Sequence, residues 1–160
     1  MADVTVRLLA PGELRLYLDI VTRAIRGLAV SHYSAEAIAG WVPHVTDEYV
    51  DLLTMNVDGE VRLLAELDGL PAGIGALVPQ TSELRACYVL PEMARRGVGR
   101  ALVREIERLA REGGLNELEL AGSLNAEAFY LEQGYRARER GEVKLSNGHT
   151  LACVWMEKDL

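Results

Sequence analysis

The stretch ELRACYVLPEMARRGVGRAL, residues 83–102, decides how this chain folds. Its first seven residues predict a strand that Pro91 ends, and a helical pattern starts at Gly97 and Gly99. A helix N-terminus has about four unpaired backbone N–H groups and roughly half a positive charge, and glycines let phosphate oxygens approach them. Three cationic side chains flank the turn: Arg95, Arg96 and Arg100. The segment therefore predicts a site for a pyrophosphate at the start of the helix.

Three kinds of phosphate-binding turn compete for this segment. A P-loop needs Lys and then Ser or Thr after its last glycine, but Arg100 and Ala101 follow Gly99. A dinucleotide-binding turn needs a small third residue where Leu102 stands, and a tighter connection after Pro91. The remaining interpretation is a turn that binds the pyrophosphate of coenzyme A.

Gly97-Val98-Gly99 after a strand resembles the GNAT-type N-acetyltransferase superfamily, whose pattern is Gln/Arg-x-x-Gly-x-Gly/Ala. The Gln/Arg position of that pattern falls on Ala94, with Arg95 and Arg96 beside it. The backbone N–H groups of the turn do not depend on that side chain.

A second family hallmark is NAEAFYLEQGY, residues 125–135. It resembles the superfamily's Asn-x-x-Ala-x-x-x-Tyr-x-x-x-Gly-Phe/Tyr segment, with looser internal spacing. We expect Asn125 to cap the helix, and the resemblance implies that it also faces the cofactor. Tyr130 falls where the family carries the Tyr that protonates departing coenzyme A. The cofactor contacts expected from both segments are Cys87, Tyr88, Val89, Arg95, Arg96, Gly97, Val98, Gly99, Arg100, Ala101, Asn125 and Tyr130.

Acetyl transfer from a thioester to an amine needs an aligned carbonyl, a stabilised oxyanion, a neutral amine and a protonated leaving group. We expect the extended backbone of residues 87–89 to pair with the pantetheine arm and to donate an N–H to the oxyanion. Tyr130 is the expected general acid. Glu83 is the expected general base, because several family members place a catalytic Glu at the same offset before the glycine turn.

The acceptor side is less defined by sequence. His32, Tyr33, Trp41 and Glu83 are the expected acceptor-binding residues, and His32 is the alternative base. Cys87 could act as an acyl-cysteine nucleophile, but no neighbouring His or Asp supports this, so we interpret it as a buried strand cysteine.

The rest of the chain predicts an α/β (α+β) fold: a single GNAT-like domain over residues 1–160, with a mixed, mostly antiparallel central sheet flanked by helices. Residues 1–58 are expected to shape the acceptor site and residues 59–160 to form the acetyl-CoA-binding core. Ser34 and Thr46 are expected helix caps, and Asp68-Gly69 predicts a hairpin. Strands are expected at 4–8, 61–65, 72–78, 83–89, 118–120, 135–140 and 151–156, and helices between 11 and 27, 34 and 43, after 46, at 98–112 and at 126–133.

Composition limits the class of function. The 160 residues are 49% apolar and 26% charged, with a net charge of −7, as in a globular chain without a basic face for nucleic acid. No apolar run is long enough to span a membrane, and no secretory signal is recognisable, so we expect a cytoplasmic protein. Cys87 and Cys153 lie far apart without metal-ligand spacing, which predicts a reducing compartment and no metal site.

The sequence thus predicts an acetyl-CoA-dependent N-acetyltransferase that acts on a primary amine of a small molecule or peptide in a ternary complex. Two alternatives stay open: a non-catalytic acyl-CoA-binding sensor or regulatory module, and an acyltransferase for a longer acyl chain. The negative charge favours a cationic acceptor, although acidity also serves solubility. Similar proteins are commonly homodimers, although nothing in the apolar pattern demands it.

Overall fold

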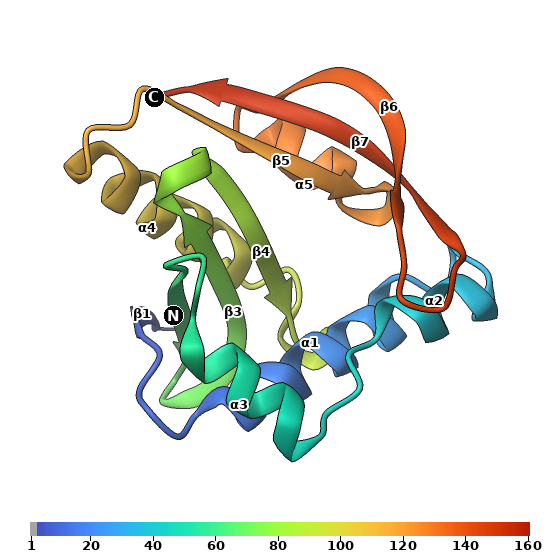
Figure 1. Cartoon of the computed structure of the whole chain (residues 1–160). Helices are drawn as coiled ribbons and strands as arrows, with labels where there is room; N and C mark the ends of the chain where they lie inside the picture. The colour runs from blue at the N-terminus through green and yellow to red at the C-terminus, as the bar shows by residue number, and fades with distance from the viewer. Residues whose placement is uncertain (1–2) are drawn as a thin grey trace.

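The computed structural model describes residues 3–160 and contains one seven-stranded sheet in the order β1-β2-β3-β4-β5-β7-β6 (Figure 1). All neighbouring strands are antiparallel except β4 and β5, which confirms the predicted mixed sheet with one parallel crossover. The strands are β1 (Val4–Leu8), β2 (Val61–Leu67), β3 (Leu70–Val78), β4 (Glu83–Val89), β5 (Glu117–Ser123), β6 (Arg136–Lys144) and β7 (Thr150–Asp159). The helices are α1 (Leu14–Leu28), α2 (Ala35–Trp41), α3 (Asp47–Met55), α4 (Val98–Glu112) and α5 (Glu127–Glu132).

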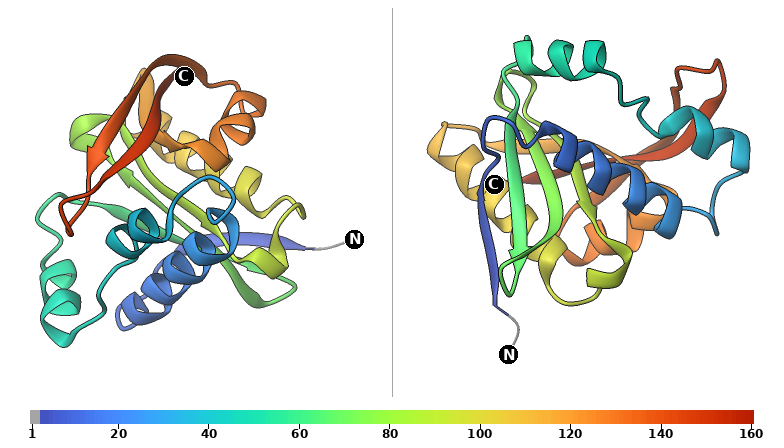
Figure 2. Two further views of the ribbon diagram at one scale, coloured as in Figure 1. Left: turned by 90° about the vertical axis from the view of Figure 1, so that its right-hand side faces the viewer. Right: turned by 90° about the horizontal axis from the view of Figure 1, so that it is seen from below.

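Helices α1 and α4 cover opposite faces of the half-sheet β1–β4 (Figures 1 and 2). Side chains of β2 alternate between them, because successive strand residues point to opposite faces: Leu63 packs in the cluster with α4, and Leu64 in the cluster with α1. Each helix buries its apolar stripe, for example Leu102 and Ile106 of α4. The two helices therefore fix the strands that carry the predicted site.

Local signals explain most element boundaries. The Ser34 and Thr46 side chains accept hydrogen bonds from the backbone N–H groups of Ala37 and Tyr49, as predicted for caps. Asp68-Gly69 turns β2 into β3 with positive φ at both residues, as the hairpin signal predicted. The expectation that Asn125 caps α5 is wrong. A 3₁₀ turn (Leu124–Ala126) precedes the helix, so the residue at its start is Ala126, and no side chain caps it.

Strands β4 and β5 separate almost as soon as they meet. Their only paired residues in the described chain are Glu83 and Glu119, beside a hydrogen bond of 2.9 Å from the Glu119 N–H to the Ser82 carbonyl. Beyond this point the strands diverge (Figure 1). The β5-facing backbone edge of residues 85–89 is thereby left without a strand partner.

A bulge interrupts β4 next to this point. Ala86 lies opposite Ala76 and Leu84 opposite Leu77, so Arg85 is the extra residue. Arg85 extends instead to carboxylates of Asp58, Glu60 and Glu83, at 2.8, 2.9 and 3.0 Å. The bulge therefore leaves Arg85 without a paired residue on β3 and allows its side chain to reach these carboxylates.

Helix α4 lies close to β3 because two glycines leave room for it. A Cβ at Gly73 would lie 2.8 Å from the Tyr88 carbonyl oxygen and 3.0 Å from Val98 Cγ1, and one at Gly75 would lie 3.0 Å from Ile106 Cδ1. At Gly73 the neighbour is backbone, which cannot rotate away.

We expect Gly73→Ala to lower the free energy of unfolding by about 1–3 kcal/mol, because the new methyl group forces β4 or α4 to shift. Urea unfolding measures this. Gly113→Ala is the matched control, since its Cβ would have no neighbour closer than 3.4 Å and its φ of −79° suits Ala. Equal stability of Gly73→Ala and wild type would contradict the proposed close packing.

Candidate functional site

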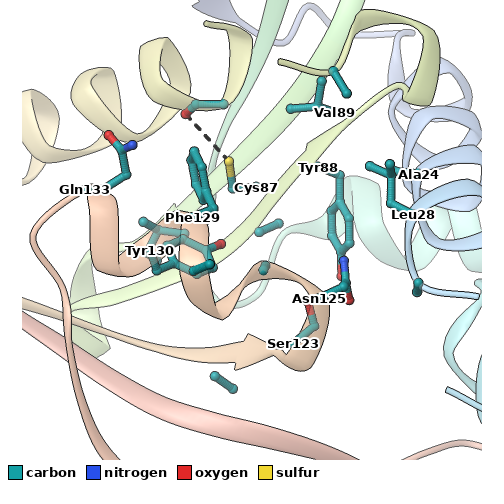
Figure 3. Close-up of a pocket in the computed structure, with 18 of the residues that line it drawn as sticks. Ala24, Leu28, Cys87, Tyr88, Val89, Ser123, Asn125, Phe129, Tyr130 and Gln133 are labelled. Atoms are coloured by element: carbon teal, nitrogen blue, oxygen red, sulfur yellow. Dashed lines mark hydrogen bonds between the residues drawn. The ribbon is translucent and has the colours of Figure 1, made fainter. Parts of the chain in front are cut away.

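A cavity of about 1110 Å³ occupies the opening between β4 and β5. Residues of β4, the turn before α4, α5 and the C-terminal part of α1 line it. Figure 3 shows side chains from β4, α5 and α1 around it. These segments are far apart in the sequence. The divergence of β4 and β5 opens the space that they surround.

The glycine turn forms one end of this cavity. Gly97 has φ of +86° and stands directly before α4, and Arg95 also adopts positive φ at +61°. Gly97, Val98 and Gly99 line the cavity. The first backbone N–H groups of α4 therefore lie at the cavity wall, as the sequence predicted for a phosphate site.

Three arginines add positive charge to this wall: Arg95, Arg100 and Arg104. None of them forms a salt bridge within residues 3–160, although most other arginines of the chain pair with carboxylates. Arg104 was missed by the sequence analysis. The signal was present, because Arg104 follows Arg100 by four residues and shares its helix face.

The structure brings most of the predicted residues to one cavity, but not all of them. The residues that line it are His32, Trp41, Cys87, Tyr88, Val89, Arg95, Gly97, Val98, Gly99, Arg100, Asn125 and Tyr130. Four other predicted residues do not line it: Tyr33, Glu83, Arg96 and Ala101.

Tyr130 is buried at 6% exposure and packs edge-to-face against Phe129 and Tyr135. Its hydroxyl has no hydrogen-bond partner in the described chain, and the residue lines the cavity (Figure 3). Burial raises the pKa of Tyr130 well above its ordinary value, so the hydroxyl keeps its proton at neutral pH. Tyr130 therefore keeps a protonated hydroxyl and lines the cavity.

Asn125 has a different role from the predicted cap. Its side-chain oxygen Oδ1 is buried without a hydrogen-bond partner, and the residue lines the cavity. A buried amide oxygen without a donor costs about 1–3 kcal/mol. This orphaned acceptor fits a ligand that brings an N–H group into the cavity.

Glu83 lies at the start of β4, where β4 and β5 touch, and its carboxylate is bonded to Arg85 at 3.0 Å. It does not line the cavity. A base at this position would need a water molecule to reach a substrate.

The residues predicted for the acceptor separate into two groups. Trp41 donates a hydrogen bond from Nε1 to the Tyr88 hydroxyl at 3.2 Å, and both line the cavity. The Tyr33 hydroxyl instead donates to the Ala152 carbonyl at 2.6 Å and accepts from the Leu124 N–H at 2.7 Å. Tyr33 thus joins the start of α2 to β7 and to the turn before α5.

Cys87 has no partner that would activate it. Its Sγ lies 3.9 Å from the Gly99 carbonyl oxygen, and burial raises its thiol pKa to about 12. Because a thiolate is the nucleophilic form, this environment suits a packed strand cysteine. The residue is half-buried, not buried as predicted, because it lines the cavity.

Residues 27–135 match the Acetyltransferase (GNAT) family. The chain belongs to this family. A Bacillus subtilis (strain 168) protein assigned as an acetyltransferase is 29% identical over 94 residues, which cover 58% of this chain and 63% of that relative. The match therefore spans less than two thirds of the relative's length.

Solved structures of the family agree with the fold. A GCN5-related N-acetyltransferase from Rhodopseudomonas palustris is 30% identical, with a TM-score of 0.88 over 98% of this chain and 95% of that one. The PaiA N-acetyltransferase of Thermoplasma acidophilum, solved in complex with coenzyme A, is 20% identical, with a TM-score of 0.77 over 99% of both chains. The second likeness concerns the fold alone.

None of the helices within residues 3–160 combines the length and apolar character that crossing a bilayer requires. Within the same residues, no group of three or more His, Cys, Asp or Glu side chains is placed to hold a metal ion.

We expect Cys87 to resist alkylation by iodoacetamide at pH 8 in the native protein. With a thiol pKa raised to about 12, little of the reactive thiolate is present at that pH. The reaction should accelerate as the pH rises towards 12, and also after unfolding in urea at pH 8. Mass spectrometry of labelled peptides separates Cys87 from Cys153. Labelling of native Cys87 as fast as a free thiol would contradict the raised pKa of this half-buried thiol.

Proposed function

We propose that this protein transfers the acetyl group of acetyl-CoA to a primary amine of a small molecule or peptide, by direct attack in a ternary complex. The single observation that carries the proposal is the unpaired edge of β4 that faces β5. This edge lines a cavity that also holds the N-terminus of α4 and three arginines. The membership of the chain in the GNAT family supports the same reaction class.

The residues of the cavity fit coenzyme A in three ways. The start of α4, with Arg95, Arg100 and Arg104, would hold the pyrophosphate. The unpaired backbone of residues 87–89 would hydrogen-bond the pantetheine arm as an added strand does. Asn125 Oδ1 would accept from an amide N–H of that arm.

Bound acetyl-CoA would supply an activated acyl thioester. A backbone N–H of β4 would stabilise the oxyanion. The new C–N bond forms as the C–S bond breaks. Tyr130 would donate its hydroxyl proton to the departing sulfur, and the proton of the attacking amine would leave through water to Glu83.

Replacing Arg95, Arg100 and Arg104 together with Ala should weaken acetyl-CoA binding by about a hundredfold, because three charge-assisted contacts to phosphate are lost. Isothermal titration calorimetry measures the dissociation constant. Arg26→Ala with Arg111→Ala is the matched control, since both arginines are exposed, form no salt bridge in the described chain and lie outside the cavity. Substitution of Gly99 is a less specific test of phosphate binding, because a Cβ there would lie 3.0 Å from Phe129 Cζ and would also disturb the packing of α5.

Failure of wild type to bind acetyl-CoA would remove the cofactor from the proposal. Binding without turnover of any amine would instead support an acyl-CoA sensor or regulatory module.

Tyr130→Phe should lower kcat by about 10²–10⁴-fold with little change in acetyl-CoA affinity, because Phe keeps the packing and removes only the proton donor. Release of free thiol from acetyl-CoA in the presence of an accepted amine measures the rate.

Glu83→Gln in the same assay tests the base, and its loss of rate should shrink as the pH rises and the free amine deprotonates. Unchanged turnover in both variants would overturn both assignments.

A further inference from the structure

A second, smaller cavity of about 220 Å³ lies between α1, α3 and the sheet. It shares four residues with the large cavity: Trp41, Arg85, Ala86 and Tyr88. These residues include Arg85, the extra residue of the β4 bulge, and Tyr88, which belongs to the residues 87–89 expected to donate to the oxyanion. A molecule held in the small cavity could therefore present an amine at this shared wall.

Arg62 is the most unusual residue in the wall of this small cavity. Its side chain is only 11% exposed, and its single ion-pair contact is from Nε to Glu60 Oε2 at 3.2 Å. Its two terminal nitrogens donate to nothing within residues 3–160. A guanidinium carries five N–H donors, so a nearly buried Arg62 has most of them available for a ligand.

Two tyrosines add further unused donors. Tyr17 and Tyr49 line the same cavity, and their hydroxyls have no hydrogen-bond partner in the described residues. Burial raises the pKa of Tyr17 above its ordinary value, so its hydroxyl stays protonated. Three side chains of the small cavity thus offer N–H or O–H groups.

The acidic groups nearby cannot satisfy these donors. Glu60 is bonded through one oxygen to Arg85 and through the other to Arg62. Asp58 and Glu83 are both engaged by Arg85. The other walls of the cavity are largely apolar: Leu18, Val21, Trp41, Pro43, Leu53 and Ala86.

We propose that the acceptor amine also carries a carboxylate, as an amino acid does, and that Arg62 binds this carboxylate with help from Tyr17 and Tyr49. The inference rests on the proposed acetyl transfer. The planar fork of a guanidinium matches a carboxylate with two parallel hydrogen bonds. The small volume suits a compact molecule of this kind.

The charges around the cavity agree with such an acceptor. The charged residues that line the cavity are Glu60, Arg62 and Arg85, and Arg85 also pairs with Asp58 and Glu83 outside the lining. The lining therefore does not repel a carboxylate, which the terminal nitrogens of Arg62 can receive. A polyamine would instead leave the two terminal nitrogens of Arg62 without an acceptor in a nearly buried place.

The test compares each standard L-amino acid with its carboxamide, in which only the negative charge is removed. Thiol release from acetyl-CoA gives kcat/KM, and thermal shift of the protein saturated with coenzyme A reports binding without turnover. We expect at least one amino acid to stabilise the protein and to be acetylated about tenfold to a hundredfold better than its amide.

Arg62→Met should abolish this preference, and Arg62→Lys should retain part of it. Arg26→Met is the control and should change nothing. The fold of Arg62→Met is checked by its acetyl-CoA affinity, which should equal that of wild type because Arg62 lies outside the large cavity.

Acetylation of amides or polyamines as efficient as that of amino acids would overturn the carboxylate inference while the acetyltransferase function stands. Absence of a thermal shift with every amino acid would also overturn it. Absence of acetyl-CoA binding by wild type would show that the proposed function itself fails.

Discussion

The whole site depends on a single place where β4 and β5 touch. One residue pair, Glu83 with Glu119, joins the two halves of the sheet, and the strands part immediately beyond it. Unpaired backbone groups in a folded protein need partners from water or a ligand. The β5-facing edge of β4 can thus bind an extended molecule that pairs with its free backbone N–H and C=O groups.

A sheet divided in this way needs other contacts to hold its halves together. Lys158 of β7 supplies several, because its Nζ lies 2.9 Å from both oxygens of Glu107 in α4 and 2.8 Å from the Gln133 carbonyl at the end of α5. Glu107 is 4% exposed, so the ion pair is largely protected from water. This contact joins the half-sheet that carries α4 to the half that carries Tyr130.

Much of the fold could be predicted from the sequence, because the decisive signals are local. Caps, turn dipeptides and apolar periodicity placed the helices and strands, and the glycine turn placed the start of α4. Arg104 was missed although its signal is local, and the other missed features depend on distant contacts. Arg62 looks like an ordinary strand residue until the fold places α1 and α3 around it. Nothing local shows that Arg85 engages Asp58 and Glu60, or that a 3₁₀ turn displaces Asn125 from the start of α5.

The bulge at Arg85 also decides which face of the sheet each side chain of β4 serves. Tyr88 and Ala86 pack towards α1, whereas Leu84 packs in the cluster with α4. In an unbroken strand, residues two apart share a face, so Leu84 would point the same way as Ala86. The single extra residue reverses this parity and turns a guanidinium towards the acidic groups before β2. One inserted residue therefore directs Leu84 into the core under α4 and leaves Ala86 and Tyr88 in the wall shared by the two cavities. Deletion of that residue would turn the side chains of β4 that precede it to the opposite faces of the sheet.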